Sequence, residues 1–331
     1  MNSKILSISV AAYNVEQYLR KTLDSLLLDD AHMEKLEVIV VNDGSKDSTQ
    51  MIAEEYAGKY PDTVRVIAKE NGGYGSTINA SLAEAQGKYF KLLDGDDWFD
   101  TEALAGLIDF LEETTADLVV SPYYAVTSKQ DEVEHHPEIP NTVSNIADVA
   151  IEKSIFQMHG IAVRTEALRA LGQPIAKHCF YTDLEYLFYC LAASDTVVRY
   201  NRSVYCYRLG LNGQSVSKEG IQKHYKDHLV VTERICSYYE QHNPTFSGGK
   251  KELIDHTVTY SIYGAFNFCM VLPDSGKHKK ELKAFDERLK EQYPQAYQRG
   301  FNSKIVRMVR RFSFRCYWAF CAYMKMKFGR W

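Results

Sequence analysis

The chain has 331 residues, of which 45% are hydrophobic and 25% charged, and its formal net charge at pH 7 is −4. This composition is typical of a globular protein with one large or two modest domains, and the charge balance argues against nucleic acid as a partner. The seven cysteines include no CxxC pair, which favours reduced thiols over a disulfide framework or a zinc site. The N-terminus lacks a signal-peptide core and no run reaches about 18 apolar residues, so we expect a cytoplasmic protein without a spanning helix.

The N-terminal part alternates between strand and helix patterns. Four segments have the short apolar or alternating pattern of strands: 5–11, 36–41, 64–68 and 89–93. Three segments between them carry apolar residues at helical spacing: 15–28, 49–59 and 76–85. Strands that alternate with helices in this way predict a parallel sheet with helices on both faces.

A polar or glycine-rich loop follows each of the four predicted strands. These loops are residues 11–14, 42–45, 71–75 and 94–97. In parallel sheets, ligands bind beyond the carboxyl ends of the strands. We therefore expect the four loops to line one cleft.

The fourth loop is Asp94-Gly95-Asp96-Asp97, with three carboxylates in four residues. Carboxylates this close repel one another unless water solvates them or a hard cation neutralises them. An isolated sequence of this kind is more often a solvated acidic turn. Convergence with three other strand-end loops instead favours a cation site.

In the second half of the chain, the predicted helices and strands alternate less regularly. We expect helices over 103–111 and 182–193, strands over 118–124 and 197–207, and mainly helices after 217. Residues 128–145 predict an exposed hairpin or loop. Its neighbouring His135 and His136 would point in different directions, so a surface loop is favoured over a metal site.

The order and spacing of the motifs resemble glycosyltransferase family 2. The matching segments are residues 9–14, 40–49, 70–73, 79–80, 87–90 and 94–97. The resemblance implies an α/β, Rossmann-like GT-A fold, with a mixed, mainly parallel sheet flanked by helices and a helical C-terminal extension. It implies a nucleotide-sugar-binding half over 1–125, an acceptor-binding half over 126–217, and a helical region over 218–331.

The resemblance also assigns a donor pocket, with UDP as the expected nucleotide. Ala11 and Tyr13 would line the nucleobase site, and Asp43 would accept a hydrogen bond from a uracil-like ring N–H. Asp43 is also the residue type of an ordinary turn before glycine. Three residues would bring backbone close to the donor, or simply form a tight turn: Asn71, Gly72 and Gly73.

The acidic loop corresponds to the family's metal-binding motif. Asp96 would ligate Mn²⁺ or Mg²⁺ directly, Asp94 would hold the ribose or the ion through water, and Asp97 would add a ligand or orient the sugar. The ion would neutralise charge on the departing diphosphate.

The resemblance places the general base in the second half, at Asp183, with Glu185 in reserve. Asp183 also stands where a helix-capping Asp would stand, and the two roles are compatible. The family usually has an acidic pair here, and Thr182 replaces its first member. The implied reaction is direct displacement with inversion at the anomeric carbon.

Three further positions have open alternatives. Arg208 would contact the diphosphate, and Ser215 lies in a loop that would close over the donor; a surface loop is an equal alternative. His159 lies where the family often has an acceptor-side residue, and a packed core histidine is equally compatible.

The expected acceptor is a saccharide or lipid-linked hydroxyl, in cell-surface polysaccharide or glycolipid synthesis, and the oligomeric state stays open. A sugar nucleotidyltransferase would share the sheet, the cation and the acidic loop. Enzymes of that class have a glycine-rich, basic loop that binds phosphate after the first strand. Residues 11–14 contain neither glycine nor a basic residue. The other alternative is a nucleotide-binding module that has lost catalysis.

The C-terminal segment is basic and aromatic. No Asp or Glu follows Glu291, and residues 304–330 contain eight Lys or Arg. Helical spacing predicts an amphipathic helix with an apolar and a basic stripe: Ile305, Val309, Phe312, Cys316 and Phe320 on one, and Arg307, Arg311 and Arg315 on the other. This pattern favours peripheral contact with the inner face of a cell membrane. The alternative is a helix docked on the protein with its basic face in water.

Overall fold

The computed structural model describes residues 4–127, 132–135, 138–149, 157–210, 218–273 and 275–328. The chain divides into two compact units. The first consists of 1–178 and 189–211, and the second of 179–188 and 212–331. Among the described residues, no helix is both long and apolar enough to cross a bilayer.

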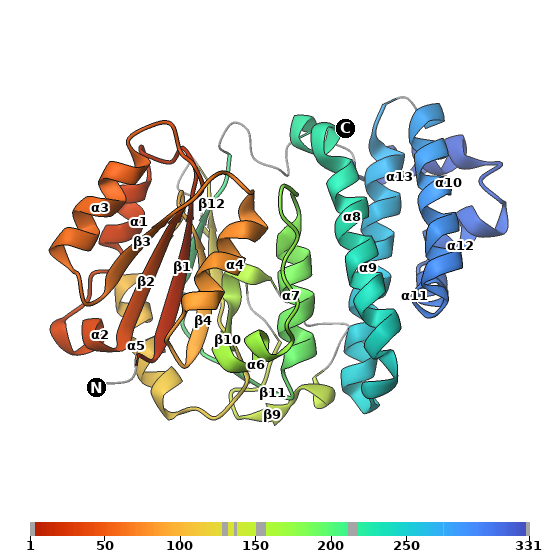
Figure 1. The fold of residues 1–331 in the computed structure, drawn as a ribbon. Helices are drawn as coiled ribbons and strands as arrows, with labels where there is room; N and C mark the ends of the chain where they lie inside the picture. Colours follow the sequence, from red (N-terminus) through yellow and green to blue (C-terminus); the bar gives the residue numbers. More distant parts are fainter. Residues whose placement is uncertain are drawn as a thin grey trace. The chain divides into compact units, whose positions relative to one another are not determined.

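An eight-stranded sheet forms the centre of the first unit (Figure 1). Its strands, in spatial order, are β3 (Val64–Ala68), β2 (Leu36–Asn42), β1 (Leu6–Ala12), β4 (Tyr89–Asp94), β10 (Ile161–Arg164), β6 (Leu118–Val120), β11 (Thr196–Arg199) and β9 (Ser144–Asn145). The first four are parallel, and β10 pairs antiparallel with both β4 and β6. This is the mixed, mainly parallel sheet that the resemblance to glycosyltransferase family 2 implies.

The central strands are buried along their length, which explains their nearly continuous apolar sequences. Every residue of β2 is buried, as are all residues of β1 except Ala11. Strands covered by helices on both faces have this pattern. The helices of this unit are α1 (Leu19–Asp24), α2 (Asp30–Lys35), α3 (Thr49–Lys59), α4 (Tyr74–Glu84), α5 (Thr101–Glu113), α6 (Thr165–Ala170) and the end of α7 (Thr182–Ala193).

A second, smaller sheet includes the strand that directly follows the acidic turn (residues 94–97). Its order is β5 (Trp98–Phe99), β12 (Tyr205–Arg208), β7 (Tyr123–Val126) and β8 (Glu132–His135). The predicted strand over 118–124 is therefore two strands in two sheets, β6 and β7. The predicted strand over 197–207 divides in the same way into β11 and β12.

The helix predicted over 15–28 is wrong in extent. Only α1 is helical there, and a second helix, α2, follows. The N–H of Val15 donates to Thr49 Oγ1 at 2.9 Å, so the start of the segment is bound to the first residue of α3. Asp29 then begins α2 by accepting a hydrogen bond from the N–H of His32, as N-cap residues do.

The second unit is helical, as expected for the C-terminal region. It contains the start of α7 and then α8 (Lys218–His242), α9 (Gly248–Val271), α10 (Ser275–Gln292), α11 (Pro294–Arg299), α12 (Lys304–Arg311) and α13 (Tyr317–Phe328). Its core includes Ile235, Ile262, Phe266 and Phe285, all fully buried. The predicted single amphipathic helix at the C-terminus is wrong, because left-handed backbone at Ser313 and Phe314 separates α12 from α13.

Two glycines of the first unit differ in the space around them, which predicts opposite effects of alanine. A Cβ on Gly75 would lie 2.1 Å from the Ala176 carbonyl oxygen, whereas a Cβ on Gly58 of α3 would meet nothing within 4 Å. We expect Gly75→Ala to destabilise the protein by about 1–3 kcal/mol and Gly58→Ala to stabilise it by up to about 1 kcal/mol. Urea unfolding of both variants measures this; equal effects would contradict the close approach at Gly75.

Candidate active site

The four loops that follow β1 to β4 are joined by hydrogen bonds. The N–H of Asn14 donates to Ser45 Oγ at 3.0 Å, and Asn14 Oδ1 accepts from the N–H of Lys46 at 2.8 Å. The N–H of Gly95 donates to the Ala11 carbonyl at 2.9 Å. These bonds join the first loop to the second and to the fourth, as the strand order predicts, while the cleft that the four loops would line stays a prediction.

Asp43 connects the second loop to the third. Its buried carboxylate accepts from the N–H groups of Gly72 at 2.9 Å and Gly73 at 2.8 Å, and from Lys69 Nζ at 2.5 Å. The Asn71 side chain donates to the Asp43 carbonyl at 2.9 Å. Gly73 has φ +78°, a conformation that favours glycine. Asp43 thus orders the glycine-rich loop rather than only forming its own turn.

The two nucleobase candidates lie beside these loops. Tyr13 is 51% exposed, so its ring is available for stacking. Ala11 is partly exposed at the end of β1. Their roles in donor binding stay predictions.

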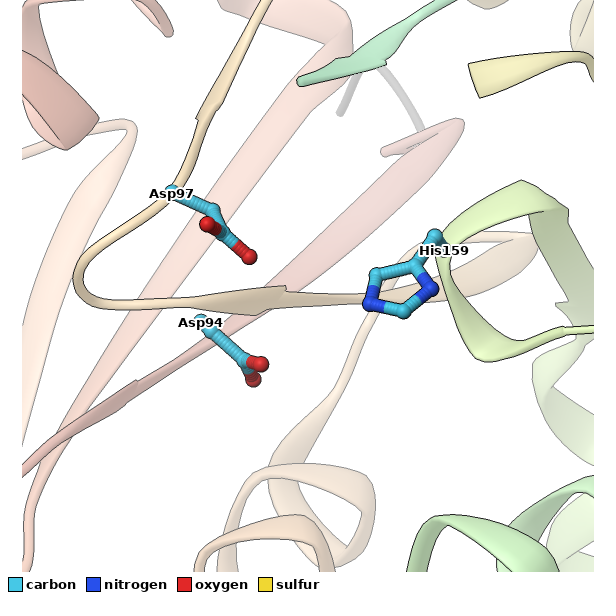
Figure 2. Close-up of side chains that lie close together, drawn as sticks. All are labelled: Asp94, Asp97 and His159. Carbon is cyan, nitrogen blue, oxygen red and sulfur yellow. The ribbon is translucent and has the colours of Figure 1, made fainter. Parts of the chain in front are cut away.

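Asp94, Asp97 and His159 place one ligand atom each within 4.8 Å of one another (Figure 2). Asp94 ends β4, and the N–H of Asp97 closes the acidic turn onto the Asp94 carbonyl at 3.0 Å. His159 comes from a short 3₁₀ helix (Met158–Gly160) that precedes β10. Figure 2 shows its imidazole approaching the two carboxylates from this separate segment.

Asp97 is the most buried acid of the turn, with 1% of its surface exposed. Its carboxylate accepts from the Tyr205 hydroxyl at 2.6 Å and from the N–H of Arg208 at 2.7 Å. Burial, and then the charges of Asp94 and Asp96, raise the pKa of Asp97 well above its ordinary value. The turn therefore holds more negative charge than it can keep ionised without a cation.

His159 contributes an uncharged imidazole as a candidate metal ligand. Its ring stacks on Tyr207 at 4.3 Å between centroids and meets the edge of Tyr205 at 4.8 Å. Burial, followed by the charges of Lys91 and His135, lowers the pKa of His159 to about 3, so the imidazole is neutral at pH 7. Its buried Nδ1 has no hydrogen-bond partner among the described residues.

Two carboxylates and a neutral imidazole are a donor set that fits a divalent ion. Sequence spacing did not indicate His159 as a member of this group, because only the antiparallel pairing of β10 with β4 brings its segment to the acidic turn. Asp96, the predicted direct ligand, lies in the same turn but outside the group of three. Burial raises the pKa of its carboxyl group.

Lys91 anchors the segment that carries His159. Lys91 is a buried residue of β4, and its ammonium donates to the carbonyls of His159 at 2.7 Å and Ile161 at 3.2 Å. Burial lowers the pKa of Lys91 to about 7. The strand that ends at Asp94 thus also fixes the backbone at His159.

Arg208 supports the acidic turn from β12. Its Nε donates to the Asp96 carbonyl at 2.8 Å, and its guanidinium lies 4.8 Å from the ring centroid of Trp98 and 4.9 Å from that of Tyr18. Lys21 Nζ lies 3.2 Å from the same Trp98 ring. Two cations therefore contact one indole next to the carboxylates.

Asp183 lies in the first turn of α7, in the part of that helix that belongs to the second unit. Burial raises its pKa, an effect partly offset by the backbone N–H groups of Asp183 and Leu184. The reserve candidate Glu185 is fully buried, and its carboxylate accepts from Arg234 Nε at 2.6 Å. Ser215 lies outside the described residues.

Comparison with known proteins gives relatives that are named as glycosyltransferases or for teichoic acid biosynthesis. The minor teichoic acid biosynthesis protein GgaB of Bacillus subtilis is 26% identical over 251 residues, which are 72% of this chain and 27% of that protein. Glycosyltransferase GlyA of Streptococcus pneumoniae serotype 4 is 26% identical over 216 residues, which are 62% of this chain and 30% of that protein. The chain thus spans less than a third of either relative.

Two solved structures have a similar fold. S. aureus TarS 1–349 in complex with UDP-GlcNAc matches with a TM-score of 0.67 and 19% identity, covering 93% of this chain and 92% of that one. The mannosyltransferase PcManGT from Pyrobaculum calidifontis, in complex with GDP-Man and Mn²⁺, matches with a TM-score of 0.53 and 18% identity, covering 100% and 89%. The family model for glycosyl transferase family 2 matches residues 7–172. The chain therefore belongs to glycosyl transferase family 2 and has the GT-A fold.

Proposed function

We propose that this protein transfers a sugar from a UDP-sugar to an acceptor hydroxyl during the synthesis of a cell-surface polysaccharide or glycolipid. The observation that carries this proposal is the group of Asp94, Asp97 and His159 at the edge of the sheet where four loops converge. The relative GgaB is named for teichoic acid biosynthesis, and TarS was solved with UDP-GlcNAc, which supports the choice of pathway and nucleotide.

The donor would bind across the four loops. Ala11 and Tyr13 would contact the nucleobase. Asp43 would orient the loop of Asn71, Gly72 and Gly73 and would also accept a hydrogen bond from a ring N–H. Arg208 would contact the diphosphate, and the loop that contains Ser215 would close over the donor. The positive charge of Arg208 suits an anionic ligand.

Asp94, Asp97 and His159 would hold a divalent ion, with Asp96 as a further carboxylate of the same turn. When bound, the ion would neutralise charge that develops on the departing diphosphate. An imidazole donor favours Mn²⁺ over Mg²⁺, which prefers oxygen ligands. PcManGT, with the same fold, was solved with Mn²⁺.

Asp183 would act as the general base. Its carboxylate would take the proton of the acceptor hydroxyl as the oxygen attacks the anomeric carbon and the bond from that carbon to the diphosphate breaks, with inversion. A pKa raised by burial makes a carboxylate a stronger base for this step.

The proposed metal site at Asp94, Asp97 and His159 predicts which mutation weakens UDP binding. We expect Mn²⁺ to strengthen UDP binding to the wild type, and His159→Ala to weaken the Mn²⁺-dependent binding at least about tenfold, since the variant loses a ligand. Isothermal titration with UDP, with and without Mn²⁺, measures both. The exposed His256, on α9, provides the control variant His256→Ala. Equal UDP affinity with and without Mn²⁺ would defeat the metal-dependent mechanism, and a protein that binds UDP with Mn²⁺ but hydrolyses or transfers no UDP-sugar would be the inactive binding module.

The proposed role of Asp183 as the general base predicts how kcat depends on pH. Asp183 must be ionised to accept a proton, and burial raises its pKa, so we expect kcat to fall as the pH is lowered through a midpoint above the ordinary aspartate value. Asp183→Asn should lower kcat about 10²–10⁴-fold and leave UDP binding unchanged. Steady-state kinetics with a panel of UDP-sugars test both; a variant with wild-type kcat would exclude Asp183 as the base.

Peripheral membrane contact through α12 and α13 is also proposed. One face of these helices is buried through residues such as Val309, Phe320 and Met324, yet the other exposes further large apolar side chains. Trp318 is 71% exposed and Met326 75% exposed. Exposed arginines lie nearby in the sequence: Arg307, Arg311 and Arg315. Apolar and basic side chains exposed together, with no acid after Glu291, suit an anionic lipid surface.

Vesicle flotation tests this surface. We expect binding to phosphatidylcholine vesicles that contain phosphatidylglycerol but not to phosphatidylcholine alone, with loss of binding at high salt. Arg311→Glu with Arg315→Glu should weaken binding about tenfold or more. Lys59→Glu with Lys226→Glu changes the net charge equally at other exposed sites and should have little effect. Equal losses in the two double variants would contradict a local lipid-binding surface.

A further inference from the structure

The segment that leads into α7 is held by one turn of α8, and both belong to the second unit. The N–H of Phe180 donates to Asp227 Oδ2 at 3.2 Å, and Cys179 Sγ donates to the Asp227 carbonyl at 3.5 Å. His224 Nδ1 lies 3.2 Å from the same Oδ2, and its ring stacks on that of Phe180 with centroids 3.6 Å apart. Three contacts thus join Cys179 and Phe180 to α8, and the fourth joins His224 to Asp227 within that helix.

The next residue, Tyr181, has a conformation that needs such support. Its φ is +62°, which is unfavourable for a large side chain and costs about 1–3 kcal/mol. Its ring packs against His228 of α8 and Phe268 of α9, and its carbonyl accepts from the N–H of Leu184 at 3.2 Å. The chain therefore turns sharply at Tyr181 to begin α7, two residues before Asp183.

We propose that Asp227 and His224 position Asp183 for proton abstraction by fixing the turn at residues 179–181. This inference rests on the proposed role of Asp183 as the base. The raised pKa of Asp183 has burial as its main cause, and Asp227 is not among its causes. Asp227 and His224 are therefore positioning residues that act through geometry, and a misplacement of about 1 Å at a reacting group costs up to about 10²-fold in rate.

Paired variants distinguish the effect of losing a contact from the effect of changing the side chain. Asp227→Asn keeps an oxygen that can accept from the Phe180 N–H, whereas Asp227→Ala removes it. His224→Phe keeps a ring that stacks on Phe180, whereas His224→Ala removes it. Glu233, on the same helix, pairs with Arg288 at the surface, so Glu233→Ala is the matched control for loss of a charged contact on α8.

We expect Asp227→Ala and His224→Ala to lower kcat for UDP-sugar turnover at least about tenfold, with unchanged Mn²⁺-dependent UDP binding. Asp227→Asn and His224→Phe should retain most of the activity, and Glu233→Ala all of it. Hydrogen exchange followed by mass spectrometry should show faster exchange at residues 180–184 in the two alanine variants.

The outcomes are distinguishable. Unchanged kcat and exchange in Asp227→Ala would overturn the proposal, as would an equal loss of UDP binding, which indicates general damage. If an alanine variant does not fold, the activity order of wild type, Asp227→Asn and His224→Phe decides: a large kcat loss in both would contradict the proposal. If the wild type turns over no UDP-sugar, the proposed function fails, while exchange at residues 180–184 still reports whether Asp227 holds the turn.

Discussion

The burial of the Asp97 carboxylate is the constraint on which the first unit's site depends. A carboxylate with almost no exposed surface needs hydrogen-bond donors, and Asp97 takes both from β12, at Tyr205 and Arg208. Leaving such a group without one donor costs about 1–3 kcal/mol or more. The acidic turn is therefore tied to a strand more than a hundred residues later in the chain, and the two sheets meet at this point.

A second buried titratable side chain, that of Lys91, completes the arrangement. Lys91 lies three residues before Asp94 on β4 and binds the carbonyls on either side of Gly160. A Cβ on Gly160 would lie 2.6 Å from the Ser121 carbonyl, so the backbone that carries His159 passes close to the β6 end of the sheet. Asp97 and Lys91 together place the turn and the histidine segment relative to each other.

Local sequence was sufficient for the part of the fold in which strands and helices alternate. The boundaries of β1 to β4 and the convergence of their loops follow from apolar runs and turn residues, because each parallel strand ends at the same edge. The divisions between β6 and β7 and between β11 and β12 could not be predicted, since a continuous apolar pattern does not say where a strand changes sheets. The grouping of His159 with Asp94 and Asp97 was equally hidden, because an antiparallel pairing between distant segments creates it. At the C-terminus, helical spacing continued through Ser313 and Phe314, and only the backbone conformation shows the break.

The contacts of Trp98 have a practical consequence. Its indole lies against Lys21 and Arg208, and Arg208 is bound through its N–H to Asp97 and through its Nε to the Asp96 carbonyl. A change in charge at the acidic turn would thus alter the surroundings of the Trp98 indole through one residue, Arg208. Of the other two tryptophans, Trp318 lies in the second unit and is exposed, and Trp331 lies outside the described residues. The chain therefore carries an intrinsic fluorophore beside its carboxylates, and tryptophan emission provides a label-free signal for occupancy of this site.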